Sequence, residues 1–271
     1  MRTILLLSGA VVAALAATSG SAAIMQVDTS HNIAYTQTSA GSVSLAGTFF
    51  TADIITSPGD PTTGSLSIPG TATPQPLSLV APNDVGFATP LLPDQATLDS
   101  TYPTGNYGFT LGGSTFVSNI PGTSYSSEIP QIANYDAFTT LDPHQSFTVD
   151  LTSGFTAQGT ESFTFFTIVD ETTNSTVVDD GFLTPGTTSF TIGADTLTAG
   201  HSYSFETIFD NRYSFTGGSD PAAFHLFDVR TAGAFTLAAD VPEPASWAMM
   251  IVGFGAIGAT MRRRVRTVRF G

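Results

Sequence analysis

The sequence predicts an all-β protein whose body is an antiparallel β-sandwich, with a signal helix before it and a single transmembrane helix after it. The body shows almost no helical periodicity, whereas apolar and polar residues alternate along short segments such as 42–47, 146–151 and 203–209. Turn-forming residues separate these segments, as in 170–175 and 185–186. Polar loops between short strands leave no room for crossover helices, which favours a sandwich.

The charge of the body narrows the classes of partner. Residues 24–240 contain 21 acidic residues and only two basic ones, Arg212 and Arg230, so their formal net charge is −19. Such a surface repels phosphate backbones, which excludes direct nucleic-acid binding. The chain has no cysteine, so disulfides and thiolate chemistry are also excluded.

The first 23 residues have the organisation of a signal peptide. Arg2 gives a positive tip, Ile4 to Ala17 is apolar, and Ser21 to Ala23 are small residues of the kind that a signal peptidase reads. We expect cleavage after Ala23 by a signal peptidase, and hence export by the cell's export machinery. A buried N-terminal helix is the alternative.

Residues 24–100 are expected to be β-rich. Proline and glycine are frequent between Ser57 and Pro93, and short strand-like pieces stand out at 66–68 and 77–80. This region could form a small lobe of its own or add strands to one extended sandwich, and we favour the small lobe.

Residues 101–240 are expected to form the β-sandwich domain. The segment from Leu197 to Phe205, with Tyr203 inside it, resembles the corner before the sixth strand of an immunoglobulin-like or fibronectin type III sandwich. That resemblance implies a tyrosine hydroxyl bonded to upstream backbone, and about seven strands between residues 141 and 239. The only tryptophan lies in the tail, so Phe163 or Phe165 is expected to fill the centre of the core.

The tail is expected to hold one membrane helix. Residues 245–261 carry no charge over 17 positions, close to the minimum for crossing a bilayer. Trp247 would lie at one interface, and the basic end would stay in the cytoplasm. That basic end begins with Arg262, Arg263 and Arg264.

Three glycines inside this helix, Gly253, Gly255 and Gly258, match the spacing G-x-G-x-x-G of dinucleotide-binding loops. That motif needs a preceding strand, a following amphipathic helix and a later acidic residue, and the sequence supplies none of them. We interpret the glycines as small residues on a membrane helix. No cofactor is predicted.

The end of the chain, residues 241–271, resembles the PEP-CTERM sorting tail in its PEPxxWA form. The matching features are Pro242, Glu243 and Pro244, the tryptophan that follows, the glycine-rich apolar run and the terminal arginines. The resemblance implies recognition of the tripeptide by an exosortase in a Gram-negative bacterium that makes exopolysaccharide. Two prolines around one residue also favour an extended segment just outside the bilayer. Alternatively, the tripeptide merely separates the body from a permanent anchor.

Catalytic patterns are missing from the sequence. The four histidines are far apart, and neither G-x-S-x-G nor H-E-x-x-H is present. Two acidic pairs, Asp170-Glu171 and Asp179-Asp180, would flank one hairpin and could meet around calcium or act on a glycoside. No metal site is predicted.

Three functions remain open. The preferred one is a noncatalytic surface or matrix protein, sorted by its tail and associated with the envelope or exopolysaccharide. A carbohydrate-binding module is the alternative, with Tyr102, Tyr107 and Tyr125 as stacking platforms on polar loops. A secreted glycan hydrolase is the third.

Overall fold

The computed structural model describes residues 24–215, 221–239 and 249–257. It confirms the all-β prediction. Its helical elements are α1 (Gln95–Thr101), the short 3-10 helix η1 (Tyr135–Thr140) and a helix over 249–257. The strands are β1 (Ile24–Ser39), β2 (Ser42–Thr56), β3 (Thr63–Ser67), β4 (Gln75–Ala81), β5 (Asp84–Ala88), β6 (Gly105–Leu111), β7 (Ser114–Ile120), β8 (Phe147–Asp150), β9 (Glu161–Asp170), β10 (Ser175–Leu183), β11 (Ser189–Ile192), β12 (Ser202–Phe215) and β13 (Ala222–Thr236).

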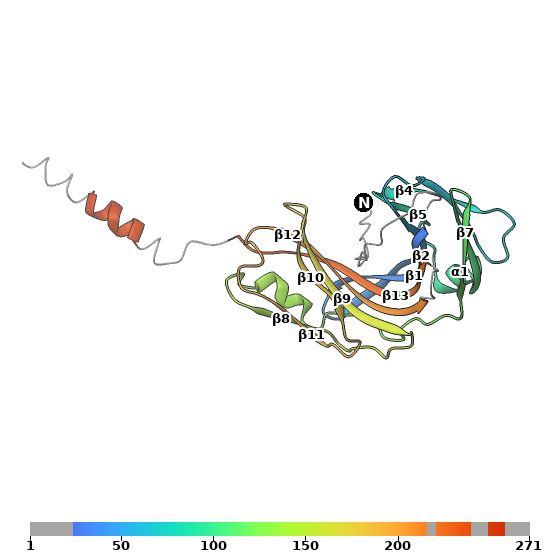
Figure 1. Cartoon of the computed structure of the whole chain (residues 1–271). Coiled ribbons are helices and arrows are strands. Elements are labelled where there is room, and N and C mark those ends of the chain that lie inside the picture. Colours follow the sequence, from blue (N-terminus) through green and yellow to red (C-terminus); the bar gives the residue numbers. More distant parts are fainter. Residues whose placement is uncertain (1–23, 216–220, 240–248, 258–271) are drawn as a thin grey trace, which may run out of the picture.

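Eleven of these strands form one curved sheet that runs through the whole body (Figure 1). Its order is β10-β9-β12-β13-β1-β2-β5-β4-β3-β6-β7, and β11 pairs with β8 in a small second sheet. The pairs are antiparallel, as predicted, except that β1 runs parallel to β13. A parallel pair needs a long connection between its strands, and here nearly the entire body supplies it.

Two hydrophobic cores lie at the two ends of the sheet. The first core is enclosed by β1 to β7, β13 and α1 and contains Phe50, Tyr107, Phe109 and Phe227. The second core is closed by η1 and the β8–β11 sheet, and its members include Phe166, Phe205, Phe209 and Phe235. Residues 24–120 therefore extend the sheet and also enclose a core of their own.

Both cores lie on the same face of the sheet. Phe209 of the second core and Asn211 lie two residues apart on β12, and Asn211 pairs directly with Phe227 of the first core. Side chains two residues apart on a strand, or opposite each other on neighbouring strands, share one face. The residues between them, such as Asp210 and Asp228, consequently point to the opposite face. We call this opposite side of β12, β13, β1 and β2 the polar face.

The tyrosine corner expected from the resemblance is present. The Tyr203 hydroxyl accepts a hydrogen bond from the Thr198 amide at 2.7 Å and donates one to the Thr198 carbonyl at 3.2 Å. Tyr203 and Leu197 are both buried in the second core. These bonds fix the chain before β12, the strand that carries much of the second core.

The prediction that Phe163 or Phe165 fills the core was wrong. Phe166 occupies that place, fully buried, with its ring stacked on Phe190 at 4.6 Å. Phe163 and Phe165 point to the other face and are half-buried beside Phe182. Because strand side chains alternate with a period of two, an error of one residue moves a side chain to the wrong face.

Candidate functional site

The tail is described only between residues 249 and 257, where the chain is helical. Gly253 and Gly255 lie in this helix. Its large apolar side chains are exposed, from 52% for Met250 to 73% for Met249. Within the described residues, no helix is long and apolar enough to cross a membrane. The other predicted site residues fall outside the described ranges: Ala23, Pro242, Glu243, Pro244, Trp247, Gly258, Arg262, Arg263 and Arg264.

The histidines make internal contacts. The ring of His225 is buried, with Nδ1 2.6 Å from Thr29 Oγ1 and Nε2 2.7 Å from Ser118 Oγ. Burial, followed by the nearby His31, lowers the pKa of His225 to about 4. This serine and histidine resemble part of a catalytic triad in spacing, but Ser118 is only 4% exposed. We interpret the group as a packed polar contact.

The acidic hairpin lies where the sequence predicted it, because β9 ends at Asp170 and β10 begins at Ser175. The Asp170 carboxylate accepts hydrogen bonds from the amides of Thr172 and Thr173 and lies 2.7 Å from His201 Nδ1. Although burial acts to raise the pKa of Asp170, these bonds hold it below its usual value. The carboxylate therefore stabilises the turn. Among the described residues, no group of three or more acidic or histidine side chains is arranged to hold a metal ion.

The prediction that Tyr102, Tyr107 and Tyr125 are exposed stacking platforms was wrong. Tyr107 is fully buried and Tyr102 is 8% exposed. Tyr125 packs against the first core and donates its hydroxyl to Asp99 at 2.7 Å. Tyr102 and Tyr107 are thus members of the first core and Tyr125 is partly buried against it, so their rings are not free to stack on a ligand in solvent.

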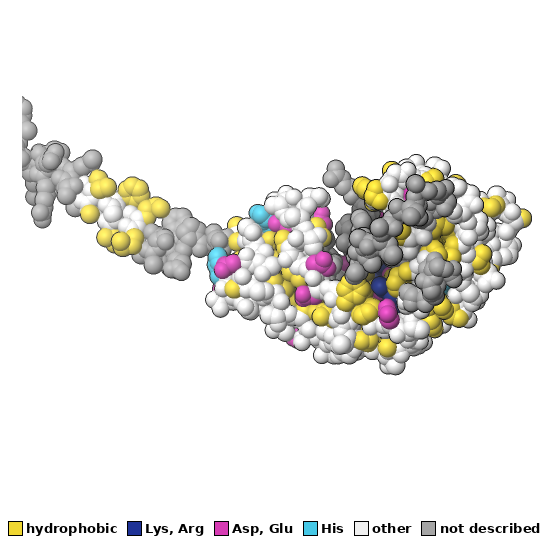
Figure 2. Space-filling model, viewed as in Figure 1, with side chains coloured by type: hydrophobic (Ala, Val, Ile, Leu, Met, Phe, Trp, Pro, Cys, Tyr) yellow, Lys and Arg dark blue, Asp and Glu magenta, His cyan; other side chains and the backbone are white. Residues whose placement is uncertain are grey.

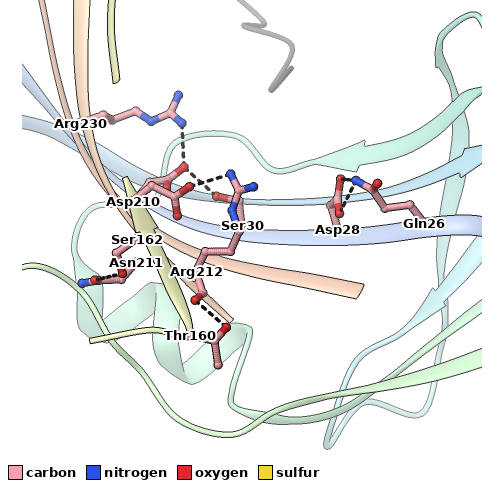
Figure 3. A network of polar contacts seen from close by, with 10 residues as sticks. Gln26, Asp28, Ser30, Thr160, Ser162, Asp210, Asn211, Arg212 and Arg230 are labelled. Atoms are coloured by element: carbon pink, nitrogen blue, oxygen red, sulfur yellow. Dashed lines mark hydrogen bonds and ion pairs between the residues drawn. The ribbon is translucent and has the colours of Figure 1, made fainter. Parts of the chain in front are cut away.

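The polar face carries an arginine cluster that the sequence analysis did not find. We define it as Glu206, Asp210 and Arg212 on β12, together with Asp228 and Arg230 on β13. Both basic residues of the body are in it. Figure 3 shows Asp210, Arg212 and Arg230 of this cluster close to one another, and Figure 2 shows acidic and basic side chains in the hollow between the two ends of the body.

Three ion pairs connect the cluster. Arg212 Nη2 lies 2.8 Å from Asp210 Oδ2, while Arg230 lies 3.0 Å from Asp228 Oδ2 and 3.3 Å from Glu206 Oε1. Ser30 Oγ also donates to Asp228 Oδ2 at 3.1 Å. These bonds use only one oxygen of each carboxylate.

The rings around the cluster belong to phenylalanines. The Arg212 guanidinium lies 5.4 Å from the ring centre of Phe163, 5.5 Å from Phe224 and 5.8 Å from Phe182. The Arg230 guanidinium lies 5.4 Å from the ring centre of Phe49. Cation–π contacts of this kind hold the planar guanidinium groups in fixed orientations.

Burial and the neighbouring charges together shift the pKa values of the cluster. It raises the pKa of Asp210 to about 7, and the neighbouring Asp228 acts in the same direction, against Arg212. Burial likewise raises the pKa of Glu206, although Arg230 opposes this. Burial acts to lower the pKa of Arg230, but Glu206 and Asp228 outweigh it and hold that pKa above its usual value.

The sequence did contain a signal for this cluster. Asp-x-Arg occurs twice, at Asp210 to Arg212 and at Asp228 to Arg230, and each time within a segment of alternating residues. Two residues apart on one strand, an aspartate and an arginine share a face. Their convergence depends on the pairing of β12 with β13, in which Asp210 stands opposite Asp228.

A row of three aspartates continues the polar face toward the first core. Asp28 on β1 stands opposite Asp53 on β2, and Asp84 follows on β5. A side-chain carbon at Gly86 would clash with the Asp53 carboxyl, so glycine leaves room for it. Burial, then Asp84 and Asp28, raises the pKa of Asp53 to about 8. Burial raises the pKa of Asp28 to about 6, although Gln26 donates to its carboxylate.

The aspartate row predicts a pH-dependent stability. Because the pKa of Asp53 is raised in the folded protein, the folded state binds more protons than the unfolded state between about pH 4 and pH 8. Stability should therefore decrease as pH rises through this window. We expect Asp53→Asn to flatten that decrease, as measured by urea midpoints at pH 5, 7 and 9.

The matched control is Asp179→Asn, which removes the same charge from an exposed position on β10. It should leave the pH dependence of the wild type in place. Parallel curves for Asp53→Asn and the wild type would contradict the assignment of the effect to this carboxyl group.

The comparisons with known proteins bear on the tail. Residues 240–264 match the PEP-CTERM protein-sorting motif. The PEP-CTERM motif indicates export and surface sorting through an exosortase, and the match includes residues 241–264 of the predicted tail 241–271. No curated protein matches the chain.

This chain, which carries the PEP-CTERM motif, is similar to parts of solved structures. It is similar to the human OSCAR ligand-binding domain, with 14% identity and a TM-score of 0.21, over 70% of this chain and 90% of that one. It is also similar to the FN1-FN3 domains of chicken CNTN1, with 10% identity and a TM-score of 0.21, over 71% of this chain and 62% of that one.

Proposed function

We propose that this protein is an exported, noncatalytic component of the cell surface or extracellular matrix, sorted and processed through its C-terminal motif by an exosortase. The observation that carries the proposal is the match of residues 240–264 to the PEP-CTERM sorting motif. In this proposal Pro242, Glu243 and Pro244 are the recognition residues. The body, residues 24–240, is the delivered part.

The proposal also assigns the two ends of the precursor. Residues 1–23 act as a signal peptide that is cleaved after Ala23. The tail helix holds the precursor in the inner membrane, with Trp247 at one interface, the three glycines on its surface and Arg262 to Arg264 in the cytoplasm.

The exposure of the tail supports this division of the chain. Both hydrophobic cores draw all their members from residues 24–237. The described tail helix contributes none of its apolar side chains to either core, and Phe254 is 68% exposed. A segment that the body does not bury is free to enter a bilayer or a processing enzyme.

The sorting step is tested by Glu243→Ala. We expect the variant to accumulate as an uncleaved, membrane-retained precursor, because the residue between the two prolines is the only charged group that the tripeptide offers to the enzyme. The measurement is the mass of the protein recovered from membrane and external fractions of the producing cells.

A matched control is Glu161→Ala, which removes an exposed glutamate from the body. It should be processed like the wild type. Normal processing of Glu243→Ala would contradict recognition through the tripeptide.

A second candidate function is glycan binding by the body. It is supported by the arginine cluster on the polar face, which combines buried carboxylates with two guanidinium groups.

A further inference from the structure

We propose that the arginine cluster and Phe182 form a binding site for a neutral glycan. The proposal rests on the proposed function, since an exported surface protein meets extracellular polysaccharide. Phe182 belongs to β10 and the arginine cluster to β12 and β13, so the ligand would lie on the polar face across β10, β9, β12 and β13. Figure 3 shows Asp210, Arg212 and Arg230 of this site.

Unpaired polar atoms are the first observation. Asp210 is 1% exposed and Asp228 is 4% exposed, yet Oδ1 of each lacks a hydrogen-bond partner among the described residues. Glu206 Oε2 and the Nε atoms of Arg212 and Arg230 also lack one. Leaving buried polar groups unpaired costs free energy, and such groups call for a ligand or ordered water as the missing partner.

The kinds of unpaired atom select the chemistry of the ligand. Three carboxylate oxygens can only accept hydrogen bonds when ionised, and two guanidinium nitrogens can only donate. A cation would leave the arginine nitrogens unpaired, and an anion would leave the carboxylates unpaired. A hydroxyl group both donates and accepts, so a ligand with several hydroxyls offers partners to both kinds of atom.

Phe182 is the second, independent observation. Its backbone has φ of +57°, a left-handed conformation that is strained for a bulky side chain. The register between β10 and β9 shifts between Asp180 and Leu183, and this irregularity turns the Phe182 ring over Phe163 and Phe165, at 5.1 Å from each. The ring stays 46% exposed beside Arg212. Strained residues gather at ligand sites, and an exposed ring fixed in place can stack on a sugar.

The charge of the body limits the charge that the ligand can carry. Residues 24–240 carry a net charge of −19, so an acidic polysaccharide would be repelled before it reached the two arginines. A neutral glycan has no such barrier. The site therefore selects uncharged chains of sugars.

The test uses the body as residues 24–240, which contain both cores. Binding is measured by calorimetry and by retardation in gels that contain a neutral glucan, galactan or mannan, or the exopolysaccharide of the producing cells. Polygalacturonate serves as the acidic comparison. We expect at least one neutral glycan to bind, and Phe182→Ala to weaken that binding about tenfold or more, as loss of an aromatic anchor does. Phe182→Trp should restore it.

The matched control is Phe215→Ala, which removes a ring of similar exposure (41%) from β12, on the face that carries the cores. It should bind like the wild type. Asp210→Asn should also weaken binding, and unfolding curves will show whether it still folds. Should it not fold, the Phe182 variants decide alone.

Three results would overturn the proposal: binding to none of the neutral glycans, tighter binding to polygalacturonate, or undiminished binding by Phe182→Ala. Because residues 24–240 do not include the tail, a negative binding result leaves the proposal of sorting through Glu243 unaffected. Conversely, normal processing of Glu243→Ala would not affect glycan binding by the body.

Discussion

Replacing Phe209 by alanine is expected to lower the free energy of unfolding by about 3–5 kcal/mol, the usual cost of removing a large ring from a core. Phe209 is fully buried in the second core, and its ring stacks on Phe155 with 4.7 Å between ring centres. It lies on β12, where the strand passes between the two cores. The surrounding β-structure cannot collapse into the space that the ring leaves, so a cavity would remain.

Denaturant unfolding measures this effect, and Phe215→Ala on the same strand is its control. Phe215 lies at the end of β12 and is 41% exposed, so its removal should cost less than half as much. Equal losses for the two variants would show that the second core does not depend on close packing around Phe209.

Replacing Asn211 by alanine is expected to lower the free energy of unfolding by about 2–5 kcal/mol, because several buried polar groups would lose their hydrogen-bond partner at once. Asn211 is fully buried, and its Nδ2 donates to the Ser124 carbonyl at 2.7 Å. Its Oδ1 accepts from the Gln158 amide and from the Ser162 hydroxyl, both at 3.0 Å. The Asn211 side chain thus connects β12 by hydrogen bonds to the loops that contain Ser124 and Gln158, and to β9.

The comparison for Asn211 is Asn119→Ala on β7. Asn119 also uses its amide in a hydrogen bond, to Asn106 at 2.6 Å, but it is exposed and water can replace the partner. Its loss should be small, within about 0.5 kcal/mol. A similar loss for both variants, in the same unfolding experiment, would contradict the role of Asn211 as a buried link.

Local patterns in the sequence predicted much of the fold. Alternation and turn residues predicted the strands around the 170–175 hairpin, and the spacing of Leu197 and Tyr203 predicted the tyrosine corner. Each of these features is made by residues close together in the chain. The sorting motif was readable for the same reason.

Features that depend on distant pairing were missed. The parallel neighbours β1 and β13 are almost 200 residues apart in sequence, and no local pattern encodes their register. The arginine cluster arises only when β12 and β13 pair, and the irregular end of β10 alone directs Phe182 over it. The tyrosines near α1 were mistaken for exposed rings because the curling of the sheet around the first core cannot be seen in the sequence.

The position of β13 has a consequence for how the body matures. This strand is the last of the described strands in sequence, yet it lies in the middle of the sheet, and it supplies Phe227 to one core and Phe235 to the other. A chain that emerges from its N-terminus onward cannot finish either half until residue 236 is available. The body can therefore complete its fold only after the residues directly before the sorting motif have been made. Folding of the body and synthesis of the sorting motif then occur at nearly the same time.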